Sequence, residues 1–339
     1  MTALSIHPPI VLTMGEPAAI GAEIALKAWQ QRFQAEIPCF LMVDWPERLR
    51  STAYSLGFDV PVVNVASPRE AIAIWPEALP VLPLSAAPQG SAGQPCTDDA
   101  PLIIESIRRS VALVQAGEAS AVVTNPLHKT SFIDCGINVP GHTEYLGQLT
   151  GGSPFMMLAI KGLKVVPFTI HIPLKDVATS LSIEKLINTI TQLNNSLRQD
   201  FLIERPIIAV AGLNPHAGEY GTMGREEIDI IIPAIKQLRA FGVDIQGPLS
   251  ADTMFTPEKR ASYDVALCMY HDQALIPLKT LDFHGGVNIT LGLNIIRTSP
   301  DHGTALDIAG KGIAREDSLI AALKMAAELA EKRQKAAQL

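Results

Sequence analysis

The chain has 339 residues, of which 47% are hydrophobic and 18% are charged, and its mean hydropathy is +0.22. This length predicts two domains or one large α/β unit, and the small charged fraction fits an oligomer that hides part of its surface. The formal net charge of −7, with no basic stripe along the sequence, argues against nucleic acid as the main ligand.

Short apolar strands alternate with amphipathic helices along most of the chain. The sequence predicts strands at residues 10–13, 39–43, 121–124, 207–211 and 265–269. Apolar residues three and four apart predict helices at residues 104–114, 182–197 and 228–238. Ser182 caps the second of these helices, and Gly242 follows the third. This alternation predicts a largely parallel sheet with helices on both faces.

Three segments depart from the alternation. Two apolar runs, residues 155–160 and 164–170, flank Gly162 and predict an antiparallel hairpin. Residues 79–99 are rich in Pro, Gly, Ser and Ala and predict an exposed connection. Residues 317–332 are Ala-rich and amphipathic, which predicts a last helix docked on the core.

The four cysteines are widely scattered and form no C-x-x-C pair. They predict reduced, mostly buried thiols in a cytoplasmic protein. The N-terminal residues lack the layout of a signal peptide, and no apolar run reaches the roughly 18 residues that span a membrane. We therefore expect a cytoplasmic protein with no membrane partner.

Three histidines each follow an apolar, strand-like run: His171 in FTIHIPL, His216 in GLNPHAGE and His271 in ALCMYHDQ. The carboxyl ends of parallel strands open into the ligand crevice, where these side chains can converge. Neutral imidazoles suit zinc and similar divalent metals, and the wide gaps between them exclude a local zinc finger. On the residues alone, isolated hydrogen-bonded turn histidines remain the alternative.

Acidic residues accompany these histidines. Asp272 follows His271, and Asp252 lies in the segment PLSADTMF. A carboxylate beside a metal site can orient a ligand histidine or accept a substrate proton. Helix capping or a turn is the alternative role for both. Glu219 is interpreted as a loop carboxylate that faces water.

Residues 278–314 contain several side chains of functional types. Lys279, Asn288 and Arg297 follow one another at intervals of nine residues. The lysine and arginine cations bind phosphate or carboxylate, although ordinary solvation is the alternative for residues scattered singly on a surface. A Gly-rich turn at residues 302–312 is typical of loops that cradle a nucleotide, whereas the G-x-G-x-x-G fingerprint is absent.

The segments GEPAAIGAE, PLHKT, GHTEY, TIHIPL, GLNPHAGE, MYHDQ, GVNITLGL and IRTSPDHGTALDIAGKG occur in the order found in 4-hydroxythreonine-4-phosphate dehydrogenases. The sequence resembles this family over nearly its whole length. The resemblance implies an α/β fold of two α/β/α subdomains, similar to isocitrate and isopropylmalate dehydrogenases, with the active site in the cleft between them. We expect residues 1–130 plus 285–339 to form a discontinuous cofactor-binding subdomain and residues 131–284 to form the metal and dimerisation subdomain.

The same resemblance implies roles for individual residues. The metal ligands are His171, His216 and His271. The substrate-binding residues are His142, Thr143, Lys279, Asn288 and Arg297. The catalytic residues are Asp252, Asp272 and Lys279. The residues that bind NAD or NADP are His302, Gly303, Thr304, Ala305, Asp307 and Gly310. The family further implies one divalent ion per site (Zn, Mg or Co), held by histidines from both subunits of a homodimer.

The implied reaction is oxidation of 4-phosphooxy-L-threonine to 2-amino-3-oxo-4-phosphooxybutanoate, which then decarboxylates to 3-amino-2-oxopropyl phosphate, in pyridoxal phosphate biosynthesis. The metal would lower the pKa of the substrate hydroxyl, and hydride would pass to the nicotinamide. Asp252, Asp272 and metal-bound water all remain candidates for the base.

The chain also departs from the family pattern. Ala19 and Ala22 stand where GEPAGIGPE has glycine and proline, and Asn125 stands where a small residue is common. A dehydrogenase of another phosphorylated hydroxy acid, such as 4-phosphothreonate or 4-phosphoerythronate, is therefore an alternative. A metal-dependent hydrolase or lyase with the same histidines is a second alternative, and it would not reduce a nicotinamide.

Overall fold

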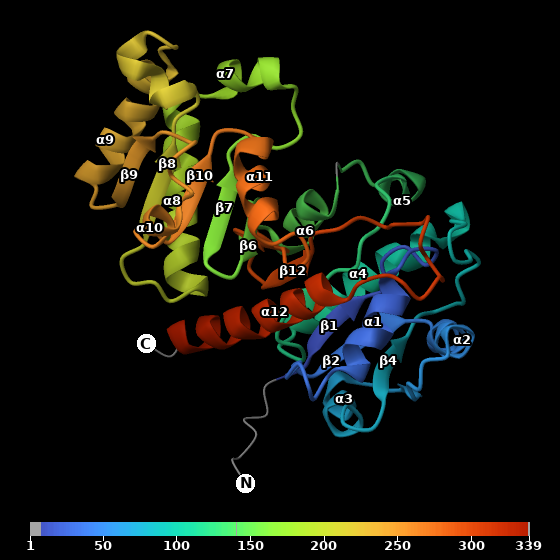
Figure 1. Ribbon diagram of the computed structural model, residues 1–339. Coiled ribbons are helices and arrows are strands. Elements are labelled where there is room, and N and C mark those ends of the chain that lie inside the picture. The colour runs from blue at the N-terminus through green and yellow to red at the C-terminus, as the bar shows by residue number, and fades with distance from the viewer. Residues whose placement is uncertain (1–7, 140, 338–339) are drawn as a thin grey trace. The chain divides into compact units, whose positions relative to one another are not determined.

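The computed structural model describes residues 8–139 and 141–337, and the chain divides into two compact units (Figure 1). Unit 1 comprises the chain up to Pro154 together with Leu293–Glu331. Unit 2 comprises Phe155–Gly292 and the chain from Lys332 onward. The expected boundaries, 130/131 and 284/285, differ from these, so that residues 131–154 belong to unit 1 and residues 285–292 to unit 2.

Unit 1 contains a parallel sheet in the order β3-β4-β2-β1-β5-β12. Its strands are β1 Ile10–Thr13, β2 Phe40–Asp44, β3 Val62–Asn64, β4 Leu79–Pro83, β5 Val122–Val123 and β12 Arg297–Pro300. Strand β5 pairs with β1 on one side and with β12 on the other. The last strand of this sheet therefore comes from a segment far along the chain.

The helices of unit 1 connect these parallel strands. They are α1 Gly21–Gln30, α2 Pro46–Leu56, α3 Pro68–Ile74, α4 Ala100–Gln115, α5 Thr130–Asp134 and α6 His142–Thr150, with a short 3₁₀ turn at Thr97–Asp99. Helix α4 packs on β1 and β2 and buries Ile103, Ile107 and Val111, as its apolar spacing predicts. The last helix, α12 Asp317–Ala336, buries Leu319, Leu323 and others, which confirms the predicted docked helix.

Unit 2 contains a mixed sheet in the order β11-β6-β7-β10-β8-β9. Its strands are β6 Phe155–Ile160, β7 Leu163–Pro167, β8 Ile207–Ala211, β9 Asp244–Leu249, β10 Val265–Cys268 and β11 Val287–Leu291. Strands β6 and β7 form the predicted antiparallel hairpin, with Ala159 opposite Lys164 and Gly162 at φ +82° in the turn. Strand β11 is also antiparallel to β6, whereas β7, β10, β8 and β9 are parallel neighbours.

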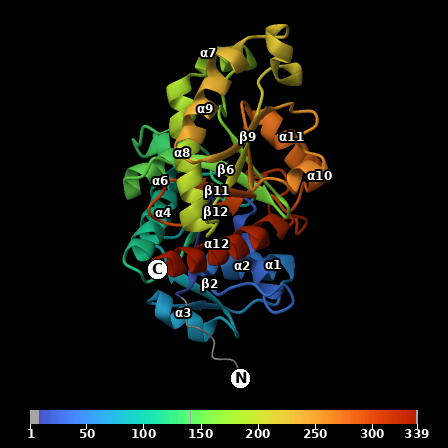
Figure 2. The ribbon, with the colours of Figure 1, turned by 90° about the vertical axis from the view of Figure 1, so that its left-hand side faces the viewer.

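The helices of unit 2 are α7 Val177–Ser180, α8 Ile183–Asp200, α9 Ile232–Ala240, α10 Pro257–Arg260 and α11 His271–Leu281. Three shorter helical segments are Leu174–Asp176, Pro215–Gly221 and the π-helical Glu227–Ile231. The Ser182 side chain accepts a hydrogen bond from the Lys185 backbone N–H, which confirms the predicted cap of α8. Helices α8 and α9 pack against each other (Figures 1 and 2), and α11 packs on β7 and β10.

The predicted α/β class is confirmed, and one connection was predicted wrongly. Within residues 79–99, Leu79–Pro83 forms strand β4 between β2 and β3. Leu79 and Val81 are fully buried, and two prolines in a five-residue strand hid the apolar pattern. The Pro- and Gly-rich residues that follow do form a connection to α4.

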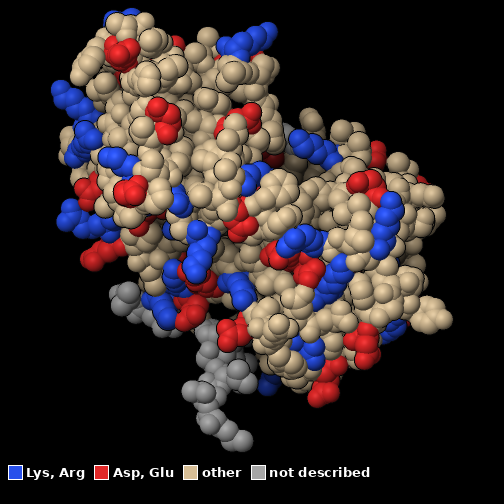
Figure 3. Space-filling view, in the orientation of Figure 1, with Lys and Arg blue, Asp and Glu red and all other residues tan. Residues whose placement is uncertain are grey.

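Three further sequence expectations concern membrane-spanning helices, surface charge and the cysteines. None of the described helices is both long and apolar enough to cross a membrane. On the face drawn in Figure 3, Lys and Arg side chains are interspersed with Asp and Glu, and the basic residues form no continuous stripe there. Of the cysteines, Cys268 is buried and the other three are half-buried free thiols.

Candidate active site

The three histidines lie just beyond the carboxyl ends of three neighbouring parallel strands of unit 2. His171 follows β7, His216 follows β8, and His271 is the first residue of α11 after β10. The ring centroids of His171 and His271 are 5.8 Å apart. The structure therefore brings these two together, as expected for side chains at one edge of a parallel sheet.

His171 and His271 line a pocket of about 280 Å³ that Asp272 also lines. The Asp272 Oδ1 atom lies 2.7 Å from Nδ1 of His271. Because an ionised carboxylate only accepts hydrogen bonds, Nδ1 carries the hydrogen, and Nε2 presents a lone pair. Metal-binding histidines typically have this arrangement, in which a carboxylate fixes the tautomer and the ring orientation. Asp272 therefore contacts a histidine and does not cap α11, whose N-cap residue makes no side-chain capping bond.

His216 lies in the turn Pro215–Gly221, beside a different carboxylate. The Ser250 hydroxyl donates to Asp252 and is the main reason that the pKa of Asp252 lies below its usual value. The charge of His216 lowers it further, which places the imidazole near this exposed carboxylate. Asp252 caps no helix and lies in a turn.

Within residues 8–139 and 141–337, no three His, Cys, Asp or Glu side chains are grouped so that they could hold one metal ion. One chain thus supplies the His171–His271 pair and, separately, His216 with Asp252. Imidazole nitrogens with carboxylates behind them are a suitable donor set for a divalent cation of the zinc type. Whether the three histidines share an ion stays a prediction.

The backbone around His216 is left-handed. Its φ is +51°, and Ala217, Glu219 and Tyr220 also have positive φ. Left-handed helical conformation costs about 1–2 kcal/mol per non-glycine residue, because Cβ approaches the following carbonyl oxygen. Strain of this kind is concentrated at functional sites, where other contacts stabilise it. Glu219 is exposed, as expected for a loop carboxylate facing water.

Arg297 lies in β12 of unit 1, where only 4% of it is exposed. Its Nε and Nη2 atoms donate to the Thr124 hydroxyl over 3.1 and 2.6 Å. Burial lowers the pKa of the guanidinium to about 10, which leaves it charged at neutral pH. A buried cation on a rigid strand is a strong attractor for a phosphate or carboxylate.

His142, at the start of α6, belongs to the same unit. Its Nε2 atom is buried and has no hydrogen-bond partner among the described residues, although the residue as a whole is half-buried. Its ring lies edge-on to Phe132 at 6.0 Å between centroids. Burial, and then the charge of Arg297, hold the pKa of His142 well below its usual value. His142 is therefore a neutral imidazole beside a buried cation, able to hydrogen-bond a ligand.

We expect the free energy of unfolding to fall as the pH drops below about 6.5, because of His142. The unfolded chain takes up a proton near this usual pKa, whereas the folded chain does not. One such group contributes a slope of up to about 1.4 kcal/mol per pH unit. Urea denaturation at a series of pH values measures it, and His142→Gln should flatten the curve below pH ~6.5. Equal slopes in both proteins would contradict this assignment.

The other predicted substrate residues are divided between the units. Thr143 is the second residue of α6 in unit 1. Lys279 lies on α11, with Nζ 5.4 Å from the ring centroid of Phe283. Asn288 lies on β11, and its buried Oδ1 has no hydrogen-bond partner within the part of the chain that the structure describes. An unsatisfied buried oxygen is costly, which supports a ligand-binding role for Asn288.

The predicted cofactor loop is held on α1 of unit 1. The Thr304 carbonyl accepts from the Ile20 N–H over 3.3 Å. Glu23 accepts from the Ala314 N–H, and Lys27 donates to the Gly312 carbonyl. The predicted loop residues His302, Gly303, Thr304, Ala305, Asp307 and Gly310 all lie at or near the surface. A loop anchored at a helix N-terminus is a suitable place for a nucleotide phosphate, but binding itself stays a prediction.

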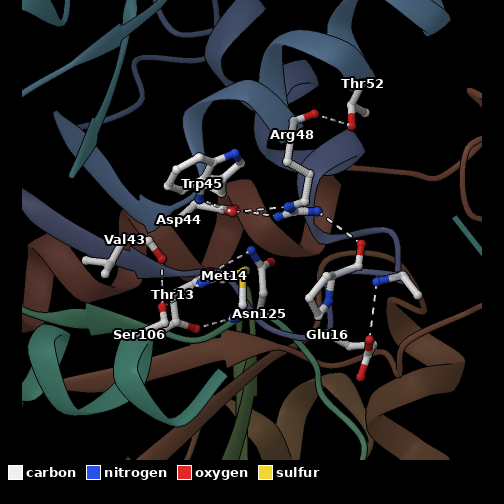
Figure 4. A network of polar contacts seen from close by, with 12 residues as sticks. Thr13, Met14, Glu16, Val43, Asp44, Trp45, Arg48, Thr52, Ser106 and Asn125 are labelled. Atoms are coloured by element: carbon white, nitrogen blue, oxygen red, sulfur yellow. Dashed lines mark hydrogen bonds and ion pairs between the residues drawn. The ribbon is translucent and has the colours of Figure 1, made fainter. Parts of the chain in front are cut away.

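Figure 4 shows the turn between β1 and α1, where the chain departs from the family pattern. Asn125 is fully buried and bonds both the backbone and the hydroxyl of Thr13. Gly15 has φ +70°, and a Cβ there would lie 2.7 Å from the Asn125 side chain. Ala19 has no positive φ and Ala22 is buried in α1, so alanine fits at both positions.

Sequence reasoning missed several residues that support the site. Thr124 orients Arg297, and Glu23 with Lys27 fixes the cofactor loop. Asn214 and Glu227 hold the His216 turn. The one signal in the sequence was the paired glutamates after GTMGR, because an acidic residue in an apolar helical pattern suggests a buried partner.

Known proteins resemble this chain over almost its entire length. The sequence profile of the family described as pyridoxal phosphate biosynthetic protein PdxA matches residues 36–326. A 4-hydroxythreonine-4-phosphate dehydrogenase of Methylorubrum populi is 51% identical, over 96% of this chain and 95% of that protein. The enzyme of the same name from Caulobacter vibrioides is 49% identical, over 96% of this chain and 98% of that protein. The crystal structure of the Klebsiella pneumoniae enzyme of that name superposes with a TM-score of 0.85 at 37% identity, covering 95% of this chain and 99% of that one.

Proposed function

Because the chain belongs to the PdxA family of pyridoxal phosphate biosynthetic proteins, we propose that it is a 4-hydroxythreonine-4-phosphate dehydrogenase. It oxidises the secondary hydroxyl of the phosphorylated amino acid, and the resulting β-keto acid loses carbon dioxide. The observation that carries the proposal is the His171–His271 pair at one strand edge, with Asp272 on Nδ1 of His271.

His171, His216 and His271 are the residues proposed to hold a divalent cation. When bound, such a cation supplies Lewis-acid polarisation of the substrate hydroxyl. Asp272 keeps His271 in the tautomer that binds metal, and Asp252 or Asp272 accepts the hydroxyl proton. The low pKa of Asp252 keeps it ionised, as a base requires.

The remaining proposed residues bind and orient the substrate. Arg297 and Lys279 hold its anionic groups, and Asn288 and His142 supply hydrogen bonds from buried polar atoms. The loop at residues 302–310 holds a nicotinamide cofactor, NAD or NADP, which accepts the hydride. Fixing donor and acceptor on rigid elements supplies much of the catalysis of hydride transfer.

A homodimer is part of the proposal, because the described residues of one chain do not group three metal ligands. Large apolar side chains are exposed close to the three histidines in the sequence: Ile172, Leu174, Tyr220, Met223, Ile276 and Phe283. Exposed apolar groups of this size mark interaction sites. A second copy covering them would bring its own His216 toward the His171–His271 pair. Location in the cytoplasm, inferred from the scattered cysteines, belongs to the same proposal.

The experiment that tests the proposal is an assay of phosphorylated hydroxy acids. 4-Phosphooxy-L-threonine, 4-phospho-D-erythronate and 4-phospho-L-threonate are offered with NAD or NADP, with and without a chelator. We expect reduced nicotinamide to form fastest with 4-phosphooxy-L-threonine, and to stop forming when the chelator removes the metal. Faster turnover of a phosphorylated sugar acid would overturn the substrate assignment, and turnover without nicotinamide reduction would overturn the dehydrogenase.

A further inference from the structure

The turn that carries His216 is a left-handed helical turn that ordinary residues do not sustain on their own. His216, Ala217, Glu219 and Tyr220 have φ between +40° and +57°, and Gly218 between them has φ +79°. Its backbone hydrogen bonds include Ala217 N–H to Asn214, Thr222 N–H to Glu219 and Met223 N–H to Gly218. Because left-handed backbone is strained at non-glycine residues, we expect contacts from outside the turn to stabilise it.

Glu227 supplies such contacts. It is the first residue of the π-helical segment Glu227–Ile231, and only 1% of it is exposed. Its Oε1 accepts from the Asn214 backbone N–H over 2.8 Å, and its Oε2 accepts from the Asn214 side-chain amide over 2.9 Å. The carboxylate thus holds both donors of the residue two positions before His216.

Three glycines let the chain close around this contact. A Cβ at Gly218 would lie 2.6 Å from Oε2 of Glu227, and one at Gly212 would lie 3.1 Å from Oε1. A Cβ at Gly224 would lie 2.4 Å from the Asn214 side-chain nitrogen. The glycines therefore admit a backbone approach that any other residue would block.

Glu226 is a natural comparison for Glu227. It also accepts from the Asn214 side-chain amide, over 2.6 Å, but it is only half-buried and makes no bond to the Asn214 backbone. Both glutamates accept a hydrogen bond from the side-chain nitrogen of Asn214. Glu227 is buried and also bonds the Asn214 backbone N–H, whereas Glu226 is half-buried and does not.

We propose that Glu227 is a positioning residue for His216: its buried carboxylate holds Asn214, and through it the left-handed turn that aims the imidazole. The inference rests on the proposed function, since it takes His216 to be a metal ligand. Residues that orient ligands from behind typically change metal affinity by about 10–100-fold when mutated.

The test compares Glu227→Gln with the matched variant Glu226→Gln. At position 227 the new amide nitrogen faces either the backbone or the side-chain donor of Asn214, so one hydrogen bond becomes a clash of two donors. We expect its Zn²⁺ affinity, measured by competition with a chelator, to fall about 10–100-fold. Hydrogen exchange of the Ala217 and Met223 amides in the metal-free protein should quicken. Glu226→Gln should change the affinity less than about threefold.

Two further variants keep the result interpretable. If Glu227→Gln does not fold, Asn214→Ala removes the side-chain amide bond to Oε2 of Glu227 and keeps the backbone N–H bond to Oε1. It should lower the Zn²⁺ affinity by a smaller factor than Glu227→Gln, and an unchanged affinity would contradict the positioning role. His216→Ala separates this inference from the proposed function. Metal loss in His216→Ala with unchanged affinity in Glu227→Gln overturns the positioning role alone, whereas full metal binding by His216→Ala overturns the ligand assignment itself.

Discussion

Alanine in place of His216 or His271 is expected to remove bound metal and dehydrogenase activity, and an equal mixture of the two variants should recover about a quarter of the wild-type activity. Loss of an imidazole ligand should weaken Zn²⁺ binding by at least about 100-fold, more than the loss of a supporting residue. The recovery follows if each site combines the His171–His271 pair of one chain with His216 of its partner.

The expected recovery of one quarter of the activity assumes that subunits exchange at random between dimers. Half of the randomly mixed dimers carry one subunit of each variant, and each such dimer has one site with all three histidines intact. Activity and bound metal are measured before and after mixing under conditions that exchange subunits. No recovery, with both variants folded and dimeric, would mean that all three ligands come from one chain. His284→Ala, which removes an exposed histidine of the same unit, is the control and should keep its metal.

Arg297→Lys is expected to lower kcat/KM by about 10²–10³ while leaving the fold intact. Lysine keeps the charge and loses the planar fork that binds an anion with two parallel hydrogen bonds. The shorter reach of an ammonium also leaves Thr124 without its second donor. Because the lost contact holds the anionic substrate, the change should fall largely on KM.

The matched control for this variant is Arg109→Lys. Arg109 on α4 is half-buried and donates to Glu105 and to the Pro83 carbonyl, outside the proposed site. Steady-state kinetics and thermal unfolding of both variants separate substrate binding from stability. Wild-type kcat and KM in Arg297→Lys would remove Arg297 from the substrate site.

The fold was predicted best where the apolar pattern was long or unbroken. Strands β1 and β8 were predicted at their observed ends, and the β6–β7 hairpin was recognised from two apolar runs around Gly162. Strand β4 was missed because prolines occupy two of its five positions, and its burial depends on neighbours distant in the sequence. Pairing of β12 with β5 is likewise set by tertiary contacts that no local pattern encodes.

The candidate site residues were predicted from their residue types and from their positions at strand ends. The contacts that support these residues were not predicted. The placement of His171 and His271 beside each other follows from adjacent parallel strands, a regularity that a sequence exposes. The hydrogen bonds from Asn214 to Glu227 could not be predicted from the sequence. These contacts require a left-handed turn between the two residues. The amino-acid composition does not indicate which non-glycine residues have a left-handed backbone.

The late arrival of β12 has a consequence for synthesis on the ribosome. Unit 1 begins with strand β1, yet its sheet is complete only after β12 has been synthesised, up to residue 300. Helix α1 likewise gains its hydrogen bonds to residues 312–314 only after those residues have emerged. The contiguous stretch Phe155–Gly292 leaves the ribosome before either arrives. The nascent chain must therefore hold an incomplete first sheet, with an open edge at β5, while the second sheet is being made. Exposed edges of this kind are where chaperones bind and where aggregation starts.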